Sequence, residues 1–171
     1  MDFAESLLRG KAAETIVSEM FREAGYLVYH FGYELMLQNL IQKGLPKMNK
    51  GNVAAEKLRT MPDFIVMKDG NVSLLEVKFR RNGPDGRLKE WADWAGKYWP
   101  EAHLIIVRAD DPCFFISTIQ QFADTGQLHP LAEDSTIRIE PDILKQYAEL
   151  VCRYCHPPNP VPVAAKPPDD F

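Results

Sequence analysis

The chain has 171 residues, of which 46% are hydrophobic and 26% charged, and this composition excludes a fibrous or wholly disordered protein. No stretch approaches the roughly 20 apolar residues that cross a bilayer, and the N-terminal sequence MDFAESLLRGKAAE lacks the apolar core of a secretory signal. We therefore expect a cytoplasmic protein with no membrane partner, in which the cysteines are reduced thiols.

The net charge of −4 is unevenly distributed along the chain. Residues 1–109 hold 16 Lys and Arg against 14 Asp and Glu, whereas residues 110–171 hold 4 against 10. The basic residues of the first part gather in two groups, which are Lys43, Lys47, Lys50, Lys57 and Arg59, then Lys78, Arg80, Arg81, Arg87 and Lys89. Such patches attract a phosphate backbone, but solvated lysines on an ordinary surface explain them equally well.

The first third of the chain predicts helices around one strand. Apolar residues at helical spacing predict a helix over 2–24, with Gly25 at its C-terminal end. The aromatic and β-branched run YLVYHFGY predicts a strand over 26–33. Two helical pieces, over 35–42 and 52–59, are predicted around a loop that contains glycine, proline and asparagine.

A hairpin is the clearest local prediction. Two strand-like runs, 63–68 and 71–79, join at Asp69-Gly70, a dipeptide favoured in two-residue hairpin turns. After a glycine-containing loop, the remaining elements are predicted in chain order as a helix over 87–99, strands over 103–109 and 113–119, and helices over 119–125 and 141–154.

These elements together predict a single α/β domain over residues 1–155, with a mixed central β-sheet flanked by helices. Six of the 13 prolines fall in residues 156–171. We expect a flexible tail there, and a proline-rich ligand for an aromatic groove is the alternative.

The hairpin turn determines which strand residues face each other. Continued pairing from a two-residue turn places Asp63 opposite Glu76, and period-two alternation puts Lys78 on the same sheet face. Two opposed carboxylates repel, so a cation must make the pair favourable, and Mg²⁺ binds through one or two carboxylates with water and substrate phosphate. Lys78 can orient or deprotonate an attacking water. The alternative without a metal is an exposed ion pair between Asp63 and Lys78, with Glu76 solvated.

Glu14 is a further acidic candidate. On a helical wheel it lies within roughly 20° of the apolar residues Leu7 and Phe21, which aims its side chain at the protein interior. Glu34 and Glu56 are alternative third acids.

A buried carboxylate needs a cation or a proton. We therefore predict that Glu14 either shares a metal with the two hairpin carboxylates or forms a salt bridge to Lys78 or Lys11.

These residues resemble a known family. The sequences MPD at 61–63 and EVK at 76–78 are similar to the two motifs of the PD-(D/E)xK nuclease superfamily, which includes restriction endonucleases and Holliday-junction resolvases. The predicted order of helix, three strands, helix and strand is that of the family core. Glu14 falls where resolvase-like members carry a glutamate on a helix. The resemblance covers roughly residues 5–109.

The resemblance implies a restriction-endonuclease-like fold and Mg²⁺-dependent hydrolysis of phosphodiester bonds, with Mn²⁺ able to substitute. It implies metal binding by Asp63, Glu76 and the backbone carbonyl of Val77, assistance from Glu14, and action of Lys78 on the water. Four residues around the following loop are expected to contact nucleic acid, namely Arg80, Arg81, Arg87 and Lys89.

The implied substrate is DNA in preference to RNA, and the family is compatible with a homodimer and with a helicase or recognition partner. One alternative is a non-catalytic nucleic-acid-binding or assembly module on the same fold. A nuclease subunit that needs a partner for its activity is the other.

The C-terminal region contains a second motif. Residues 152–156 match the C-x-x-C-H pattern of haem attachment, which we reject because the sequence shows no export signal. A zinc site built from Cys152, Cys155 and His156 needs a fourth ligand, for which Cys113 or His129 is available.

Overall fold

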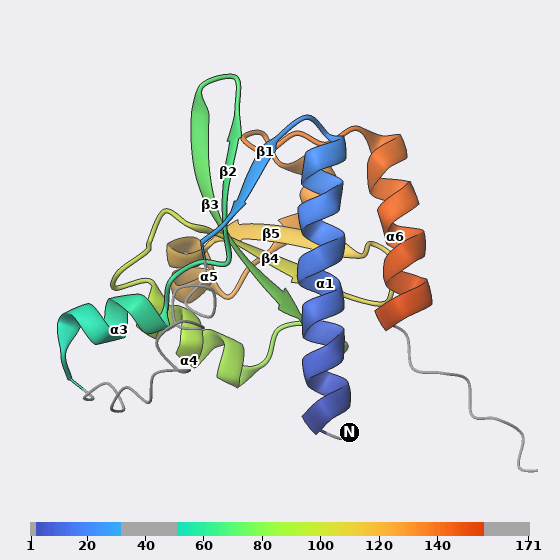
Figure 1. Ribbon diagram of the computed structural model, residues 1–171. Helices are drawn as coiled ribbons and strands as arrows, with labels where there is room; N and C mark the ends of the chain where they lie inside the picture. The colour runs from blue at the N-terminus through green and yellow to red at the C-terminus, as the bar shows by residue number, and fades with distance from the viewer. Residues whose placement is uncertain (1–2, 32–50, 156–171) are drawn as a thin grey trace, which may run out of the picture.

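The computed structural model describes residues 3–31 and 51–155, which form an α/β fold with a six-stranded mixed open sheet and five α-helices (Figure 1). The strands lie in the order β1-β2-β3-β4-β5-β6, with only the β3–β4 pair parallel. In chain order the elements are α1 (Phe3–Glu23), β1 (Leu27–His30), α3 (Val53–Arg59), β2 (Phe64–Lys68), β3 (Asn71–Phe79), α4 (Gly86–Ala95), β4 (His103–Val107), β5 (Phe114–Thr118), α5 (Ile119–Thr125), β6 (His129–Pro130), the short 3₁₀ helix η1 (Leu131–Glu133) and α6 (Pro141–Cys155).

Helices cover both faces of the sheet. Helices α1 and α6 lie side by side against one face, and α4 and α5 pack against the other (Figure 1). Strand β4 contributes to both cores, because its alternate residues point to opposite faces. Ile105 and Val107 join the α1–α6 core, whereas Leu104 and Ile106 join the α4–α5 core. The predicted mixed sheet flanked by helices is confirmed.

The predicted hairpin is confirmed together with its register. Strands β2 and β3 pair from Lys68–Asn71 at the turn to Phe64–Leu75. Asp69 and Gly70 both have positive φ, 51° and 80°, as a two-residue turn of type I′ requires. The hairpin extends beyond the rest of the sheet (Figure 1).

Most other predicted elements agree with the structure to within a few residues. The predicted helix over 87–99 ends earlier, at Ala95, and 96–99 continue in turns. Strand β1 covers Leu27–His30, inside the predicted range of 26–33. β6 and η1 were missed because elements of two or three residues show no periodicity.

Some predictions fall on other parts of the chain. The helical piece over 35–42, residues 32–33 of the predicted strand and the tail over 156–171 lie outside the described residues.

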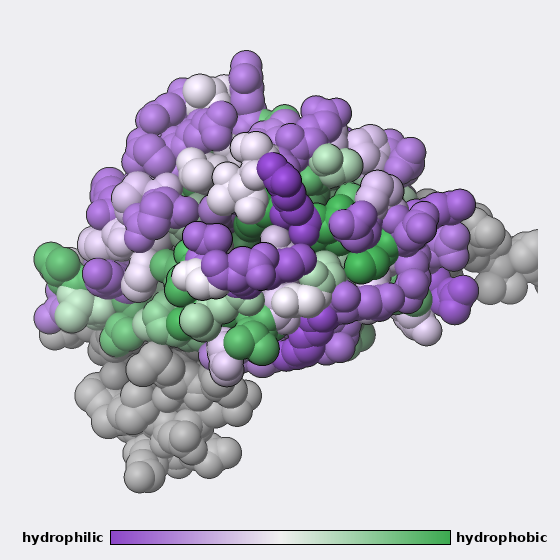
Figure 2. Space-filling model, turned by 90° about the horizontal axis from the view of Figure 1, so that it is seen from above, coloured by the Kyte–Doolittle hydropathy of each residue, from purple (hydrophilic) through white to green (hydrophobic). Residues whose placement is uncertain are grey.

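The surface is mainly polar where the hairpin turn projects. Seen from that end, hydrophilic residues cover most of the described surface, with hydrophobic residues showing between them (Figure 2). Within the described ranges, no helix combines the length and apolar character that crossing a membrane requires.

Candidate active site

Alternate residues of β3 serve opposite faces of the sheet. Leu75 and Val77 are buried in the core beneath α1 and α6. Glu76 and Lys78 therefore point to the other face, which α4 covers. The β2–β3 ladder ends at Phe64–Leu75, so Asp63 is the next residue in register and lies at the level of Glu76.

Asp63 is held through both its side chain and its backbone. Its carboxylate Oδ2 accepts a hydrogen bond of 2.8 Å from the backbone N–H of Val77. Its backbone carbonyl accepts another, also 2.8 Å, from the N–H of Phe31. The half-buried carboxylate is thus fixed against the second motif, as the predicted hairpin register requires.

Glu76 and Lys78 form an ion pair on the α4 face. Lys78 Nζ donates a hydrogen bond to Glu76 Oε1. Glu76 is only 4% exposed, and the Lys78 side chain 28%. The same ammonium lies 5.1 Å from the centre of the Trp91 ring on α4. The alternative of a solvated Glu76 on an exposed sheet face is therefore wrong.

The pKa values of Asp63, Glu76 and Lys78 are all shifted from their ordinary values. Burial raises the pKa of the Asp63 carboxyl, against the opposing effect of Lys78. Burial also raises the pKa of Glu76 to about 8. For Lys78, burial acts to lower the pKa, but the neighbouring Glu76 and Asp63 outweigh it, and the pKa is raised. Burial thus makes the charged form of both carboxyls costly, and a divalent cation bound between them would offset that cost.

Glu14 approaches the pair from a different side. Its helix, α1, packs on the opposite face of the sheet, and its carboxylate is bonded to Lys11 Nζ at 3.0 Å. Of the two lysines predicted as salt-bridge partners, Lys11 is the one bonded to Glu14, and the pair is exposed where a buried one was expected. Glu14 also raises the pKa of Asp63 and of Glu76, which shows that it lies within electrostatic reach of both.

The helical-wheel argument for Glu14 needs a correction. Leu7, which was predicted to share its buried stripe, is 53% exposed, because the buried side of α1 is formed by Ala13, Val17 and Met20. The Glu14 side chain is itself 25% exposed.

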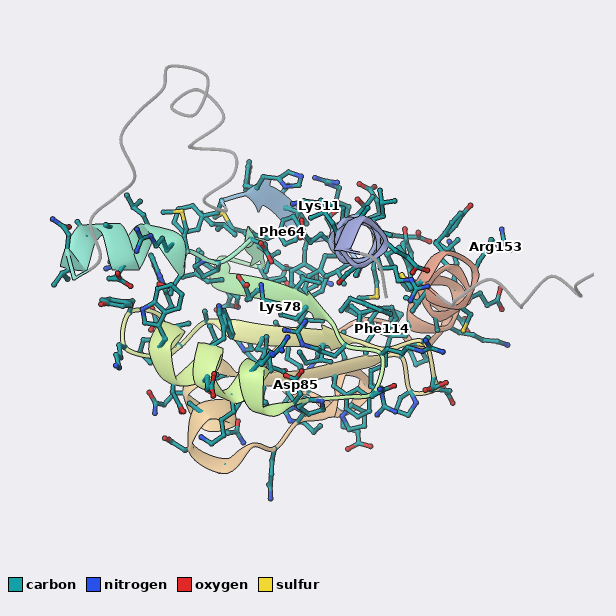
Figure 3. All side chains as sticks on the ribbon, turned by 90° about the horizontal axis from the view of Figure 1, so that it is seen from below. Lys11, Phe64, Lys78, Asp85, Phe114 and Arg153 are labelled. Atoms are coloured by element: carbon teal, nitrogen blue, oxygen red, sulfur yellow. The ribbon has the colours of Figure 1, made fainter. Side chains whose placement is uncertain are left out.

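Glu14 does line a hollow of about 260 Å³ between α1 and β3. Val77, Lys78, Lys11 and Arg80 line the same hollow. Figure 3 shows Lys78 on β3 between α1, which carries Lys11, and α4. The hollow gives solvent a route to the second motif from the α1 side.

Glu14 is not close enough to Asp63 and Glu76 to form a three-carboxylate metal group with them. In the part of the chain that the structure describes, no three His, Cys, Asp and Glu side chains are close enough together to hold a metal ion. Asp63 and Glu76 provide two carboxylates, and Mg²⁺ commonly takes one or two with water and substrate phosphate completing its shell. The backbone carbonyl of Val77 belongs to the same strand as Glu76 and directly follows it.

The expected nucleic-acid contacts separate into two groups. Arg80 lines the hollow beside Lys78, and Arg81 and Arg87 are exposed on the adjoining loop and helix start. Lys89 instead pairs with Asp93 at 3.2 Å and donates to the carbonyl of Ala123 on α5 at 2.5 Å.

Lys89 also lies about 200° around α4 from Trp91, and therefore on the far side of the helix from the site. The structure does not bring Lys89 to Lys78.

The remaining candidates are a third acid and the ligands of the zinc hypothesis. Glu56 bonds to Arg59 on α3, and Glu34 falls outside the described residues. His156 of the zinc hypothesis also falls outside them. Cys113, Cys152 and Cys155 are free thiols.

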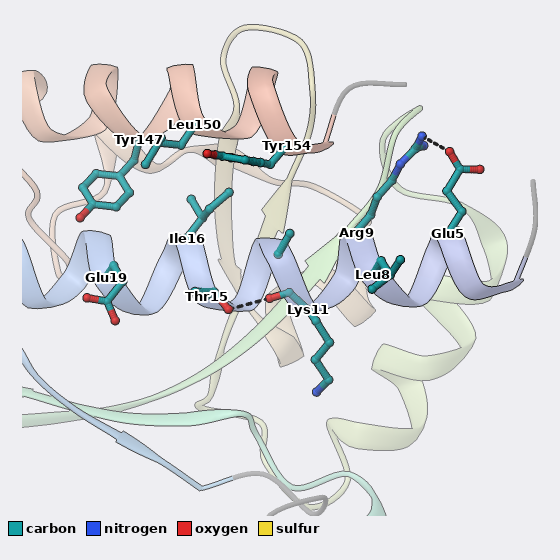
Figure 4. A pocket seen from close by; sticks show the side chains of 11 residues that line it. Glu5, Leu8, Arg9, Lys11, Thr15, Ile16, Glu19, Tyr147, Leu150 and Tyr154 are labelled. Atoms are coloured by element: carbon teal, nitrogen blue, oxygen red, sulfur yellow. Dashed lines mark hydrogen bonds and ion pairs between the residues drawn. The ribbon is translucent and has the colours of Figure 1, made fainter. Parts of the chain in front are cut away.

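A larger hollow of about 790 Å³ lies between α1 and α6 (Figure 4). It is lined mainly by apolar side chains, among them Leu8, Ile16, Leu150 and Tyr154. Four charged residues also line it, and two of them, Arg9 and Glu5, form an ion pair (Figure 4). It lacks opposed carboxylates, so the smaller hollow is the better candidate for chemistry.

Sequence reasoning missed the contact of Trp91 with Lys78 and the position of Lys11 at the hollow. The only available signal was the helical spacing of Trp91, which equally indicates core packing. In comparisons with known proteins, no family model and no curated protein matches this chain.

Proposed function

We propose that the protein is a metal-dependent nuclease of the PD-(D/E)xK type, with the restriction-endonuclease-like variant of its α/β fold. The observation that carries the proposal is the pairing of the half-buried Asp63 carboxyl with the buried Glu76 carboxyl, with the Lys78 ammonium bonded to Glu76. This arrangement sits at the position where the MPD and EVK motifs meet.

The pair is difficult to explain by stability alone. Burying a carboxylate costs free energy unless it is paired, and apolar residues of similar volume commonly give a more stable core. The raised pKa values of Asp63 and Glu76 report that cost directly. A bound divalent cation would offset the cost of burying both carboxylates, which supports a functional role for the pair.

Each residue has a distinct part in the proposed reaction. Asp63 and Glu76, together with the Val77 carbonyl, would hold Mg²⁺ or Mn²⁺, and Glu14 would add negative charge from the α1 side. When bound, the ion supplies Lewis acidity toward a phosphodiester and lowers the pKa of water. Lys78 would orient or deprotonate the attacking water and stabilise phosphoryl charge.

The proposed substrate is DNA, held by cations around the hollow. Arg80 and Lys11 line it with Lys78, and phosphates are the groups that such cations bind. We place the activity in the cytoplasm, where the free thiols of all three cysteines would stay reduced.

The test is incubation of the purified protein with supercoiled, linear, single-stranded and branched DNA in Mg²⁺ or Mn²⁺. We expect cleavage that EDTA abolishes and that Asp63→Ala and Lys78→Ala each remove. Cleavage that both variants retain would reject this site.

Two other outcomes distinguish the alternatives. Binding of DNA without cleavage under any condition would favour a non-catalytic module. Cleavage only after a helicase or recognition protein is added would favour a subunit of a larger nuclease.

A further inference from the structure

Lys78 contacts two groups that belong to different elements. One is the Glu76 carboxylate, two residues away on β3, and the other is the face of the Trp91 ring on α4, 5.1 Å from the ammonium. The two contacts differ in what a metal ion does to them. A divalent cation competes for the carboxylate, whereas the neutral ring is no ligand for it.

We propose that Trp91 is a positioning residue, which holds the Lys78 ammonium at the site when the Glu76 carboxylate binds a divalent cation. The inference rests on the proposed function, because it requires Glu76 to bind the ion. Without a second contact, Lys78 would lose its partner and gain a repulsive neighbour at the moment its position matters. A flexible lysine side chain released in this way would spread over many rotamers.

Trp91 is suited to this role because its backbone is firmly fixed. Leu88, Ala92 and Ala95 of α4 are fully buried against the sheet. Asp85 caps the helix, its carboxylate accepting a 2.8 Å hydrogen bond from the N–H of Leu88. Trp91 itself packs against this core. The ring face therefore stays in place whether or not Lys78 is bonded to Glu76.

The chain contains a second lysine–tryptophan contact that does not involve Lys78, although its tryptophan ring also packs edge-on against Phe31. Lys57 on α3 lies 4.9 Å from the centre of the Trp99 ring, and Trp99 Nε1 donates to the Lys57 carbonyl at 3.2 Å. Trp99→Leu removes a lysine–tryptophan contact of similar geometry without touching Lys78. It separates a general loss of packing from a loss at the site.

The direct test is NMR of the protein labelled with ¹³C at the lysine Cε, with the Lys78 signal assigned by its absence in Lys78→Arg. A lysine over an indole face is shifted upfield by the ring current. We expect the Lys78 signal to be upfield in the metal-free protein and to stay upfield on adding Mg²⁺. In Trp91→Leu with Mg²⁺ it should move to the position of exposed lysines, and in Trp99→Leu it should not.

The kinetic test separates positioning from substrate binding. Trp91→Leu is expected to lower kcat by about 5- to 30-fold, as the loss of one cation–π contact would, with KM changed by less than about twofold. Trp91→Phe keeps a ring face and should recover most of kcat, while Trp99→Leu should lower kcat by less than Trp91→Leu, because it leaves both contacts of Lys78 in place. A rise in KM with kcat unchanged would instead identify Trp91 as a substrate contact and overturn the inference.

The two proposals fail in different ways. If Mg²⁺ binds and the wild-type Lys78 signal moves to the position of exposed lysines, the role of Trp91 is wrong and the metal site stands. In a second sample, labelled with ¹³C at the glutamate carboxyls, an unchanged Glu76 signal on adding Mg²⁺ would show that the metal site is wrong, and the role of Trp91 falls with it.

Discussion

The two faces of strand β3 carry different kinds of side chain, apolar on one face and charged on the other. On one face, Leu75 and Val77 are packed into the core beneath α1 and α6. On the other, Glu76 places a carboxylate in an equally buried position, beside the ammonium of the partly exposed Lys78. Residues that follow each other in the chain thus differ in what they contribute: the apolar ones contribute stability and the charged ones cost it. The difference between the two faces supports placing the proposed reaction on the α4 face of β3.

The largest expected effect separates activity from stability at Asp63. Asn at this position keeps an oxygen to accept from the Val77 N–H but removes the negative charge. We expect Asp63→Asn to reduce DNA cleavage by about 10³-fold, because the charge that binds the cation is lost. Its thermal unfolding midpoint should equal or exceed that of the wild type. If Asp63→Asn retains activity, Asp63 is not needed for cleavage. If it is inactive and calorimetry shows that it is unfolded, Asp63 serves stability and not activity.

The opposite result is expected on the other face. Leu75→Ala removes a buried side chain and should lower the free energy of unfolding by about 2–5 kcal/mol, measured in urea. The molecules that remain folded should retain kcat. A selective loss of kcat in a stable Leu75→Ala protein would show that the two faces are not separable.

The next effect is a pH dependence of stability in the absence of divalent ions. Burial raises the pKa of Glu76 to about 8, whereas the unfolded chain releases that proton near the ordinary value of 4.5. The folded state therefore binds the extra proton, and its stability is full below about pH 4.5 and falls as the pH rises toward 8.

Glu76→Gln removes this titration. We expect calorimetry to show a wild-type unfolding midpoint that falls between pH 5 and 8 by about 7–14 °C more than that of Glu76→Gln. Added Mg²⁺ should stabilise the wild type more at pH 8 than at pH 5, because the ion displaces the proton. Equal pH slopes for the two proteins would show that Glu76 is not buried as described.

The smallest expected effect concerns the hollow. Arg80 lines it, whereas Lys89 is tied to Asp93 and α5. In an Asp63→Asn background, which prevents cleavage, Arg80→Ala should weaken DNA binding and reduce the salt slope by about 1. Lys89→Ala serves as the matched control and should change neither. An equal effect of both substitutions, measured by fluorescence anisotropy, would indicate a diffuse basic surface instead of a site.

Much of this site could be predicted because it depends on local rules. The Asp69-Gly70 turn set the hairpin register, and the register placed Asp63 level with Glu76. Glu14 emerged as the least exposed of the four glutamates of α1. These inferences use only the periods of strands and helices.

What could not be predicted depends on how elements pack. Whether Lys89 or Trp91 faces the sheet follows from the orientation of α4, which the sequence pattern of that helix leaves open because aromatic residues recur along it. The exposure of Leu7 likewise follows from where α1 meets the sheet, not from its spacing. Helix packing decided each of these.

The most direct test of the central claim is a crystal of the protein soaked in Mn²⁺, with anomalous diffraction used to locate the ion. A nuclease centre of the proposed type predicts an anomalous peak between the carboxylates of Asp63 and Glu76, in contact with the Val77 carbonyl, and its absence from Asp63→Asn crystals. A wild-type crystal with Mn²⁺ bound elsewhere, or nowhere, and with Glu76 still paired to Lys78, would contradict the account.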